Sequence, residues 1–379
     1  MQNPASPTST PQDDAPRPHV IQPRRVRPWQ MLWAGGLIVA LFVWTVHLRA
    51  PTRPSAEAHT LNGLTMGTTW TIRIADPNLR PEDLPSLRAE VEAVFVEINR
   101  QMSTYDPASE ISRFNDGPAG VERTVSAEVA RVARFALNLA EKSGGAFDPT
   151  IGPLVELWGF GRPPPRPQPP SDAEIAEVLE AVGYRKVTLT EDGRLSKAHG
   201  RLRLDLNAVA KGYGADAAAE VLSRRRLRNF YVEVGGEVVA RGERPGGGPW
   251  RIGVDRPEAD SPPGAAIERV LHVRDFAVAT SGDYRNFRRD EATGEPYAHI
   301  FDPRTGRPVR RMAGSVTVIA EDCLKADGLA TALYVLGPDE GIAWLGLNFP
   351  EADALFILRR PDGTLEQRGT AEFDARTQR

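Results

Sequence analysis

A run of residues without a formal charge, Trp29–Leu48, constrains this chain more than any other feature. Twenty residues in a helix extend about 30 Å, which is the thickness of a bilayer core. Arginines flank the run, with three before it and two after it: Arg24, Arg25, Arg27, Arg49 and Arg53. Because positive charge favours the cytoplasmic side, we expect one transmembrane helix in the inner membrane, with the C-terminal part of the chain in the periplasm.

The residues on either side of this helix divide the rest of the chain. Residues 1–28 are rich in Pro, Ser, Thr and Gln without apolar periodicity, so we expect a disordered cytoplasmic tail. A linker is expected at 49–60 and a single folded domain over 61–370. The alternative to a retained helix is a cleaved signal peptide. We favour the helix because the leading segment is long and no small-x-small cleavage site follows directly.

Composition excludes several classes of site. Cys323 is the only cysteine, so neither an intramolecular disulfide nor a cysteine-cluster zinc site is possible. The formal net charge of -3 gives no bulk attraction to nucleic acid. No cysteine lies near the uncharged run, so we expect no lipoprotein-type lipid attachment there.

Periodicity places strands and helices along the outer domain. Alternation indicates a strand over Thr68–Ile74, and a helix is expected to begin near Asn207. Apolar spacing indicates further helices at 87–98, 129–140, 171–182, 325–336 and near 339–347, and further strands at 231–240, 250–254, 268–280, 315–320 and 353–358. Because strands and helices are partly segregated along the chain, we expect an α+β fold with one mixed sheet rather than a doubly wound one.

Asp327 and Thr331 stand four residues apart in an otherwise apolar segment. In a helix this spacing puts both oxygen-bearing side chains on one face, a turn apart. Two hard oxygen ligands so placed can hold part of a magnesium shell. Such a pair is more often solvated or locally hydrogen-bonded, so the metal interpretation depends on the other segments.

Three loops have more glycine, proline or polar residues than packing alone requires. In MSTYDP, residues 102–107, Tyr105 follows a helix, where an exposed ring can stack on a flat ligand. In GGAFDPTIGP, residues 144–153, three glycines and two prolines fix a tight backbone suited to close approach of a ligand. Met66-Gly67-Thr68 lies at a strand entrance. The simpler interpretations are caps, turns and a helix-terminating loop.

Lys211 and His299 are the candidate charged groups. In LDLNAVAKGYGAD, residues 204–216, free N–H groups at a helix start attract anions and Lys211 adds positive charge. The glycine spacing is not that of a Walker loop. His299 precedes Asp302-Pro303 and a Thr-Gly turn, an arrangement that can position a general base. The simpler interpretations are a capped helix with a solvated lysine and a structural histidine.

Taken in order, these segments resemble the ApbE family of FAD:protein FMN transferases. The resemblance extends from about Leu61 to Leu358 and rests on MGTTW, MSTYDPASEISRFN, GAFDPTIGPL, LDLNAVAKGYGAD, VEVGGEV, ATSGDYRNF, HIFDPRTGRPV, SVTVIA and KADGLATALYVLG. It implies an ApbE-like α+β domain that binds FAD and Mg²⁺. The family transfers the FMN half of FAD to a Thr or Ser hydroxyl of a target protein through a phosphoester bond and releases AMP.

The resemblance also implies roles for particular residues. His299 matches the family's candidate catalytic base. Residues that would contact FAD are Met66, Tyr105, Ala146, Phe147, Asp148, Asp205, Lys211 and Phe301. Magnesium would take the side chains of Asp327 and Thr331 and the backbone oxygen of Ala208. Some relatives carry a second Asp at the position of Ala330, so here phosphate oxygens and water must complete the metal shell.

Two other activities use the same residues. Water in place of a protein hydroxyl would make the site a magnesium-dependent FAD pyrophosphatase giving FMN and AMP. A non-catalytic extracytoplasmic flavin-binding protein would need neither His299 nor the metal pair. For the transferase, the expected partner is an acceptor flavoprotein that carries a Thr or Ser target motif. Many relatives are held at the membrane by a lipidated cysteine, whereas this chain offers Trp29–Leu48.

Overall fold

The computed structural model describes residues 58–377, with gaps at 163–165, 167, 259–260, 263, 285, 292, 295 and 310–312. Ser55–Arg379 forms one compact unit. The expected tail, the helix Trp29–Leu48 and most of the linker lie outside the described residues. Within the described part of the chain, no helix combines the length and apolar character needed to cross a bilayer. The first strand begins at His59, two residues before the expected start of the domain.

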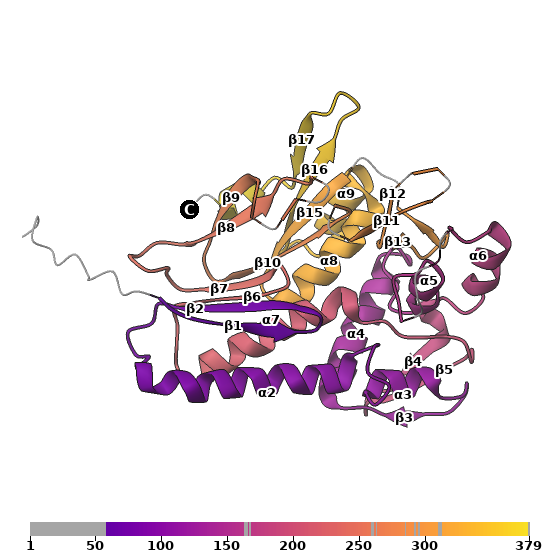
Figure 1. Cartoon of the computed structure of the whole chain (residues 1–379), viewed down its shortest axis with the longest axis horizontal. Helices are drawn as coiled ribbons and strands as arrows, with labels where there is room; N and C mark the ends of the chain where they lie inside the picture. The colour runs from indigo at the N-terminus through magenta and orange to yellow at the C-terminus, as the bar shows by residue number, and fades with distance from the viewer. Residues whose placement is uncertain are drawn as a thin grey trace, which may run out of the picture. The chain divides into compact units, whose positions relative to one another are not determined.

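An eight-stranded sheet forms the centre of this unit (Figure 1). Its strands in spatial order are β1 (His59–Thr65), β2 (Thr68–Ile74), β6 (Phe230–Val234), β7 (Glu237–Arg241), β10 (Phe276–Gly282), β15 (Ala313–Ala320), β16 (Asp353–Arg359) and β17 (Leu365–Gly369). Every neighbouring pair is antiparallel. The expected α+β class is confirmed, but the sheet is not mixed, because short turns join several neighbouring strands and such connections pair them antiparallel.

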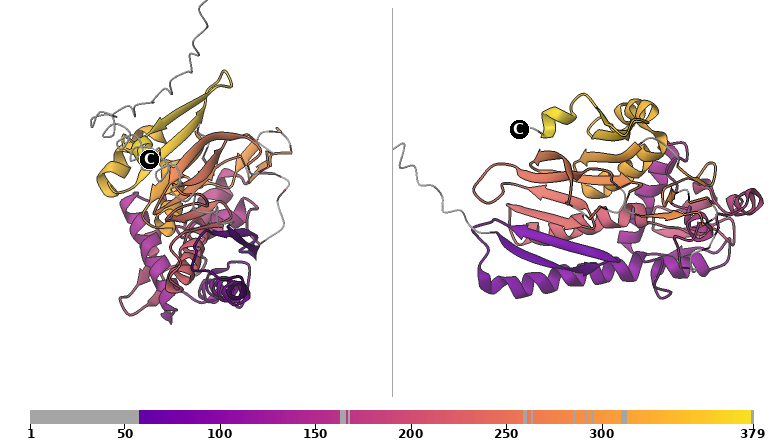
Figure 2. Two further views of the ribbon diagram at one scale, coloured as in Figure 1. Left: turned by 90° about the vertical axis from the view of Figure 1, so that its left-hand side faces the viewer. Right: turned by 45° about the horizontal axis from the view of Figure 1, so that its top comes forward.

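Side chains that alternate along the strands contribute to separate hydrophobic cores on the two faces of the sheet. On β7, Val239 belongs to the core under the helices, whereas Val238 and Ala240 belong to the core on the opposite face. The first core includes α2 (Leu84–Met102) and α7 (Asn207–Arg224), which lie along β1, β2 and β6 (Figures 1 and 2). The opposite core is covered by β8 (Trp250–Asp255), β9 (Ile267–Val273) and α10 (Phe373–Thr377).

The helix α8 (Cys323–Leu336) packs on β10, β15 and α7 (Figure 1). The other described elements are α3 (Glu110–Asp116), α4 (Ala127–Lys142), α5 (Gly152–Leu157), α6 (Asp172–Leu179), α9 (Pro338–Asn348), β3 (Arg123–Thr124), β4 (Val187–Leu189), β5 (Arg194–Lys197), β11 (Phe287–Arg289), β12 (Pro296–Ala298), β13 (Phe301–Asp302) and β14 (Arg307–Pro308). Short 3₁₀ turns occur at Pro81–Asp83 and Tyr184–Lys186.

Two segments expected to be single strands are each broken by a turn. The segment 231–240 divides into β6 and β7 at Gly235-Gly236, whose φ angles are 62° and 104°. The segment 268–280 divides into β9 and β10 beside Asp275, whose φ is 61°. Glycine and aspartate adopt this left-handed region most readily, and apolar alternation continues across so short a turn. The helices expected at 325–336 and 339–347 are confirmed.

Candidate active site

The N-terminal parts of α7 and α8 cross at very close range. A Cβ atom on Gly212 would lie 2.2 Å from the carbonyl oxygen of Cys323 and 2.8 Å from the Cβ of Asp327, so only glycine fits there. The backbone N–H groups of Cys323 and Leu324 donate to the carboxylate of Asp216 on α7, at 2.8–3.0 Å. These contacts fix the start of α8 against α7.

The crossing places Asp327, one of the expected metal ligands, against α7. Gly212 donates its backbone N–H to Oδ2 of Asp327 at 3.0 Å, and Asp327 is only 4% exposed. In an α-helix the N–H of Gly212 points toward the carbonyl of Ala208, so the Asp327 carboxylate lies beside that carbonyl. Thr331 follows one turn later on α8, and its hydroxyl lies 3.2 Å from the hydroxyl of Ser281 on β10.

The donor atoms of this cluster are those that magnesium prefers. Asp327 supplies a carboxylate, Thr331 a hydroxyl and Ala208 a carbonyl, all hard oxygen ligands that fit Mg²⁺. Among the described residues, no group of three His, Cys, Asp or Glu side chains is placed to hold a metal. A site with one carboxylate is therefore expected to take further ligands from water and from phosphate oxygens.

A buried cation and a second buried acid stand next to the ligand cluster. Nζ of Lys211 lies 2.5 Å from Oε1 of Glu237 and 3.9 Å from Oδ1 of Asp327. Burial raises the pKa of both carboxyl groups, and the Lys211 charge opposes that rise. Burial lowers the pKa of Lys211, but the charges of Asp327 and Glu237 outweigh it, so the pKa is raised and the ammonium stays charged.

Met66 lies over the same part of α7. It connects β1 to β2 with a φ of 47°, a conformation that is rare outside glycine. A Cβ on Gly214 would meet the Cε of Met66 at 2.5 Å, so the methionine side chain extends onto the helix. Met66 therefore lies within one helical turn of Lys211 along α7.

His299 is half-buried in a bend between β12 and β13. Its Nδ1 lies 3.0 Å from the carbonyl oxygen of Asn286, and its backbone N–H donates to the same oxygen at 3.1 Å. A neutral ring that donates from Nδ1 leaves Nε2 as its basic nitrogen. Burial lowers the pKa of His299, the Asn286 carbonyl opposes this, and the Lys211 charge lowers the pKa further. The lowered pKa keeps the ring neutral at pH 7.

Phe160 connects His299 to two of the other expected ligand-binding residues, Phe301 and Tyr105. Its ring centroid lies 6.3 Å from that of His299 and 5.8 Å from that of Phe301. Its carbonyl accepts a hydrogen bond from the hydroxyl of Tyr105 at 3.3 Å. The sequence did not lead us to Phe160. A single aromatic residue between two glycines, in Gly159-Phe160-Gly161, is the signal that could have indicated it.

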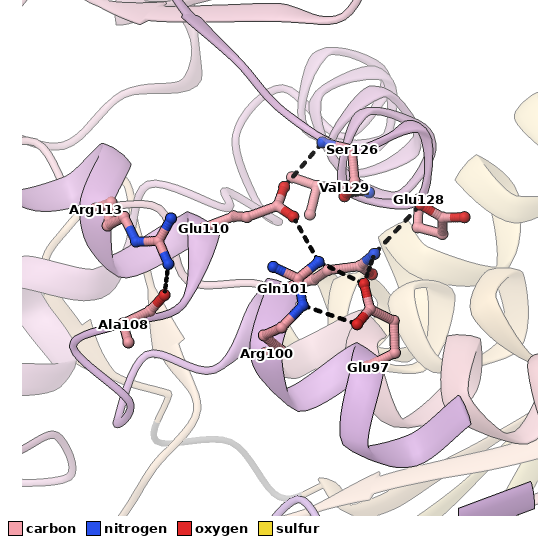
Figure 3. A network of polar contacts seen from close by, with 9 residues as sticks. All are labelled: Glu97, Arg100, Gln101, Ala108, Glu110, Arg113, Ser126, Glu128 and Val129. Atoms are coloured by element: carbon pink, nitrogen blue, oxygen red, sulfur yellow. Dashed lines mark hydrogen bonds and ion pairs between the residues drawn. The ribbon is translucent and has the colours of Figure 1, made fainter. Parts of the chain in front are cut away.

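Hydrogen bonds hold the loop that carries Tyr105. Oγ of Ser103 accepts the backbone N–H groups of Tyr105 and Asp106, each at 3.1 Å. Figure 3 shows the polar network that joins the ends of α2, α3 and α4 around this loop. There Glu110 accepts from Arg100 at 3.3 Å and from the backbone N–H of Ser126 at 2.8 Å. The ring of Tyr105 itself is 59% exposed, as expected for a stacking platform.

Asp205 lies in the segment before α7, and its charge acts on Tyr105. Burial raises the pKa of Tyr105, and the charge of Asp205 adds to that rise. Oδ1 of Asp205 accepts the backbone N–H of Asn207 at 2.9 Å. Asn115 holds this segment, because its side chain both donates to and accepts from the backbone of Leu204, at 2.8 Å and 2.7 Å. Burial also raises the pKa of Asp205.

The loop containing Ala146, Phe147 and Asp148 is buried. Asp148 accepts the N–H and the hydroxyl of Thr150, at 2.8 Å and 2.6 Å, and the N–H of Tyr184 at 2.9 Å. Its carboxylate therefore supports the loop from inside. The N–H of Asp205 donates to the carbonyl of Pro149 at 2.7 Å, which joins this loop to the Asp205 segment. Contact between these three residues and a ligand stays a prediction.

The chain has close relatives in sequence and in structure. The ApbE family pattern matches residues 66–356. A protein named FAD:protein FMN transferase from Vibrio cholerae is 40% identical over 316 residues, covering 83% of this chain and 91% of the relative. One of the same name from Haemophilus influenzae is 36% identical over 323 residues, covering 84% and 91%.

Solved structures give the same result. The flavin transferase ApbE from Vibrio cholerae superposes with a TM-score of 0.76 at 38% identity, covering 84% of this chain and 99% of that one. The ApbE protein from Thermotoga maritima superposes with a TM-score of 0.73 at 32% identity, covering 85% and 99%. The similarity therefore includes almost the whole of these relatives.

Proposed function

The chain belongs to the ApbE family, and we propose that it transfers FMN from FAD to a Thr or Ser hydroxyl of an acceptor protein, releasing AMP. Relatives at 36–40% identity are named FAD:protein FMN transferases. One observation carries the proposal: the Lys211 ammonium lies 3.9 Å from Oδ1 of Asp327, beside the close crossing of α7 and α8. Burial and the charge of Lys211 also lower the pKa of His299, which favours the neutral ring that a general base requires. A base, a cation and hard oxygen ligands together suit transfer at a pyrophosphate.

The reaction replaces the phosphoanhydride bond of FAD by a phosphoester bond to the acceptor. The acceptor oxygen forms a bond to the FMN-side phosphorus of FAD while the bond from that phosphorus to the bridging oxygen breaks. The acceptor proton passes to Nε2 of His299, and AMP leaves with the bridging oxygen. Holding the hydroxyl, the phosphorus and the base in line contributes to the rate in addition to the proton transfer.

Asp327, Thr331 and the carbonyl of Ala208 would hold Mg²⁺, which neutralises pyrophosphate charge when bound. Lys211 adds positive charge on the same side, because its pKa is raised by the neighbouring carboxylates. For the flavin, the exposed ring of Tyr105 is suited to stacking. The remaining contacts to FAD are assigned to Met66, Ala146, Phe147, Asp148, Asp205 and Phe301.

Covalent FMN on an acceptor is the test of this function. Candidate acceptors with a Thr or Ser target motif are incubated with the purified chain, FAD and magnesium, and then analysed by mass spectrometry. We expect FMN attached to a Thr or Ser and an equal amount of AMP. AMP formed at the same rate without acceptor, with no modified residue, would instead establish FAD hydrolysis.

We also propose that Trp29–Leu48 anchors the chain in the inner membrane with the catalytic domain in the periplasm. The support is the uncharged run and the arginines before it. Protease added to spheroplasts should remove the C-terminal domain. Full protection of that domain in intact spheroplasts would contradict this orientation, and a soluble mature form lacking residues 1–50 would identify a cleaved signal.

A further inference from the structure

Lys211 lies between two buried carboxylates that come from different elements of the fold. Glu237 is the first residue of β7, and Asp327 is on the second turn of α8. The ammonium is much closer to Glu237, at 2.5 Å, than to Asp327, at 3.9 Å. The side chains of the two acids are 4% and 5% exposed, whereas that of Lys211 is 30% exposed.

The turn before Glu237 is shaped around the lysine. Gly235 has a φ of 62°, and a Cβ there would lie 3.2 Å from Cδ of Lys211 and 2.8 Å from Cγ2 of Thr68. The aliphatic part of Lys211 thus passes over a glycine that leaves room for it, and its head group reaches the carboxylate two residues further on. The same turn therefore provides both the path of the lysine and its partner.

Packing does not account for a carboxylate at this position. Glu237 is 3% exposed, and its second oxygen, Oε2, is buried without a hydrogen-bond partner among the described residues. A buried acceptor left without a hydrogen bond destabilises the fold, and more so when the group is charged. A residue that destabilises the fold in this way is expected to have another role.

We propose that Glu237 is a positioning residue that holds the Lys211 ammonium away from Asp327, so that the Asp327 carboxylate stays available to the metal ion. The proposal rests on the metal ligands assigned under the proposed function. Without the charge of Glu237, Asp327 is the nearest carboxylate to the ammonium. Lysine and metal would then compete for the same oxygen atoms.

This role predicts opposite effects for two residues in direct contact. Removing the charge of Glu237 should weaken metal binding although Glu237 is not a ligand. Removing the cation of Lys211 should strengthen metal binding, because a competitor for Asp327 disappears and two carboxylates remain without a positive charge. A merely structural role would weaken metal binding in both variants.

The experiment measures binding of Mn²⁺, used as the magnetic substitute for Mg²⁺, to the full chain by electron paramagnetic resonance. It is done with and without FAD on wild type, Glu237→Gln, Lys211→Met and the double variant. We expect about tenfold weaker Mn²⁺ binding for Glu237→Gln. Effects of this size are typical when a residue that supports the metal ligands, but does not bind the metal itself, is replaced. Lys211→Met should bind Mn²⁺ more tightly than wild type, and the double variant should return close to wild type.

Lys325 and Glu351 provide a matched control. They form a 3.1 Å ion pair in which Glu351 is far more exposed than Glu237, and Lys325 lies only two residues from Asp327 on α8. Lys325→Met and Glu351→Gln change the net charge by the same amounts and should leave Mn²⁺ binding unchanged. If they reproduce the effects of Lys211→Met and Glu237→Gln, the effects reflect net charge and the proposal is wrong.

Several other results would overturn the positioning role. These are unchanged Mn²⁺ binding in Glu237→Gln, weaker binding in Lys211→Met, or a double variant as weak as Glu237→Gln, which would make Glu237 a ligand itself. If Glu237→Gln does not fold, as judged by thermal melting, Glu237→Asp and Lys211→Met still decide the sign. FMN transfer is measured separately on wild type. If wild type transfers FMN but the variants do not show the expected changes in Mn²⁺ binding, only the positioning role is rejected. If the variants show those changes but wild type does not transfer FMN, only the proposed function is rejected.

Discussion

The metal side of the candidate site, formed by Ala208, Lys211, Glu237, Asp327 and Thr331, is built mostly on two helices in the core. The loop side, formed by Tyr105, Phe160, His299 and Phe301, is built on bends and short strands. On the metal side the backbones approach so closely that a Cβ on Gly212 would collide with a carbonyl. On the loop side the contacts are ring to ring at about 6 Å and one long hydrogen bond of 3.3 Å.

This difference indicates how each side is expected to respond to substitution. The metal side has buried charges that neutralise one another, so removing one leaves another unpaired in the interior. Apart from the buried Phe301, the loop side has half-buried or exposed groups whose loss removes one contact at a time. We therefore expect large, coupled effects on the metal side and smaller, separable effects on the loop side.

Asp327→Ala should have the largest effect. It removes the only carboxylate assigned to the metal and leaves Lys211 with Glu237 alone. We expect single-turnover FMN transfer to fall about 10⁴-fold, equivalent to about 5.5 kcal/mol of transition-state stabilisation. Thr331→Val should cost less, because a neutral hydroxyl is the weaker ligand. EDTA should stop FMN transfer by wild type, and added magnesium should restore it. Normal turnover by Asp327→Ala in chelated buffer would show that the metal assignment is wrong.

His299→Ala tests the loop side and should slow transfer about 10³-fold, within the range for loss of a general base. FAD affinity should change little. Because burial lowers the pKa of His299, the neutral ring persists below pH 6.5. The wild-type rate should therefore fall with decreasing pH only through a value below 6.5, where the ring becomes protonated.

In His299→Ala the fall in rate that protonation of the ring causes at low pH should disappear. The rate should instead rise with pH as the acceptor hydroxyl ionises more readily. Both enzymes are compared by single-turnover rate and FAD affinity from about pH 5 to pH 9. If affinity collapses while the rate on bound FAD is unchanged, His299 is a binding residue and the base assignment is wrong.

The stabilities of Gly212→Ala and Gly214→Ala, compared with each other, test how rigid the metal side is. Both glycines are on α7, but a Cβ on Gly212 meets a backbone carbonyl at 2.2 Å, whereas on Gly214 it meets the flexible end of Met66 at 2.5 Å. We expect Gly212→Ala to destabilise the fold by about 2 kcal/mol. For Gly214→Ala the gain in helix propensity, about 1 kcal/mol, should offset most of the strain. Thermal melting compares the two, and equal melting temperatures would refute the close crossing.

Tyr105→Ala should have the smallest effect. An exposed aromatic ring that stacks on a flavin contributes about 1 kcal/mol, so the KM for FAD should rise about fivefold while Mn²⁺ binding stays unchanged. Tyr105→Phe keeps the ring and loses only the hydrogen bond to the Phe160 carbonyl. It should therefore resemble wild type. A change in Mn²⁺ binding with Tyr105→Ala would mean that the two sides are not separable.

Much of the metal side could be predicted from local sequence. Helical periodicity placed Asp327 and Thr331 one turn apart, and α8 confirms that placement. The helix start near Asn207 is also confirmed. Both inferences depend only on spacing within one helix, which sequence expresses directly.

Only the tertiary structure identified Glu237 and Phe160. Glu237 contacts Lys211 across 26 residues, and Phe160 accepts from Tyr105 across 55. The sequence pattern around Glu237 or Phe160 relates each residue only to neighbours within a few positions. It therefore cannot identify a contact with a residue far away in the chain. The turn at Gly235-Gly236 that ends β6 was likewise not predicted, because the apolar alternation of a strand continues on both sides of it.

The sequence by itself therefore determined the helices, the α+β class and the family resemblance, because each follows from local pattern or from the order of segments. The antiparallel pairing of the sheet, the contact of Gly212 with α8 and the position of Lys211 between two acids were decided by tertiary structure. Gly212 and Asp327 are 115 residues apart in the chain. Such contacts form only when the core brings distant segments together and excludes water from the charges between them.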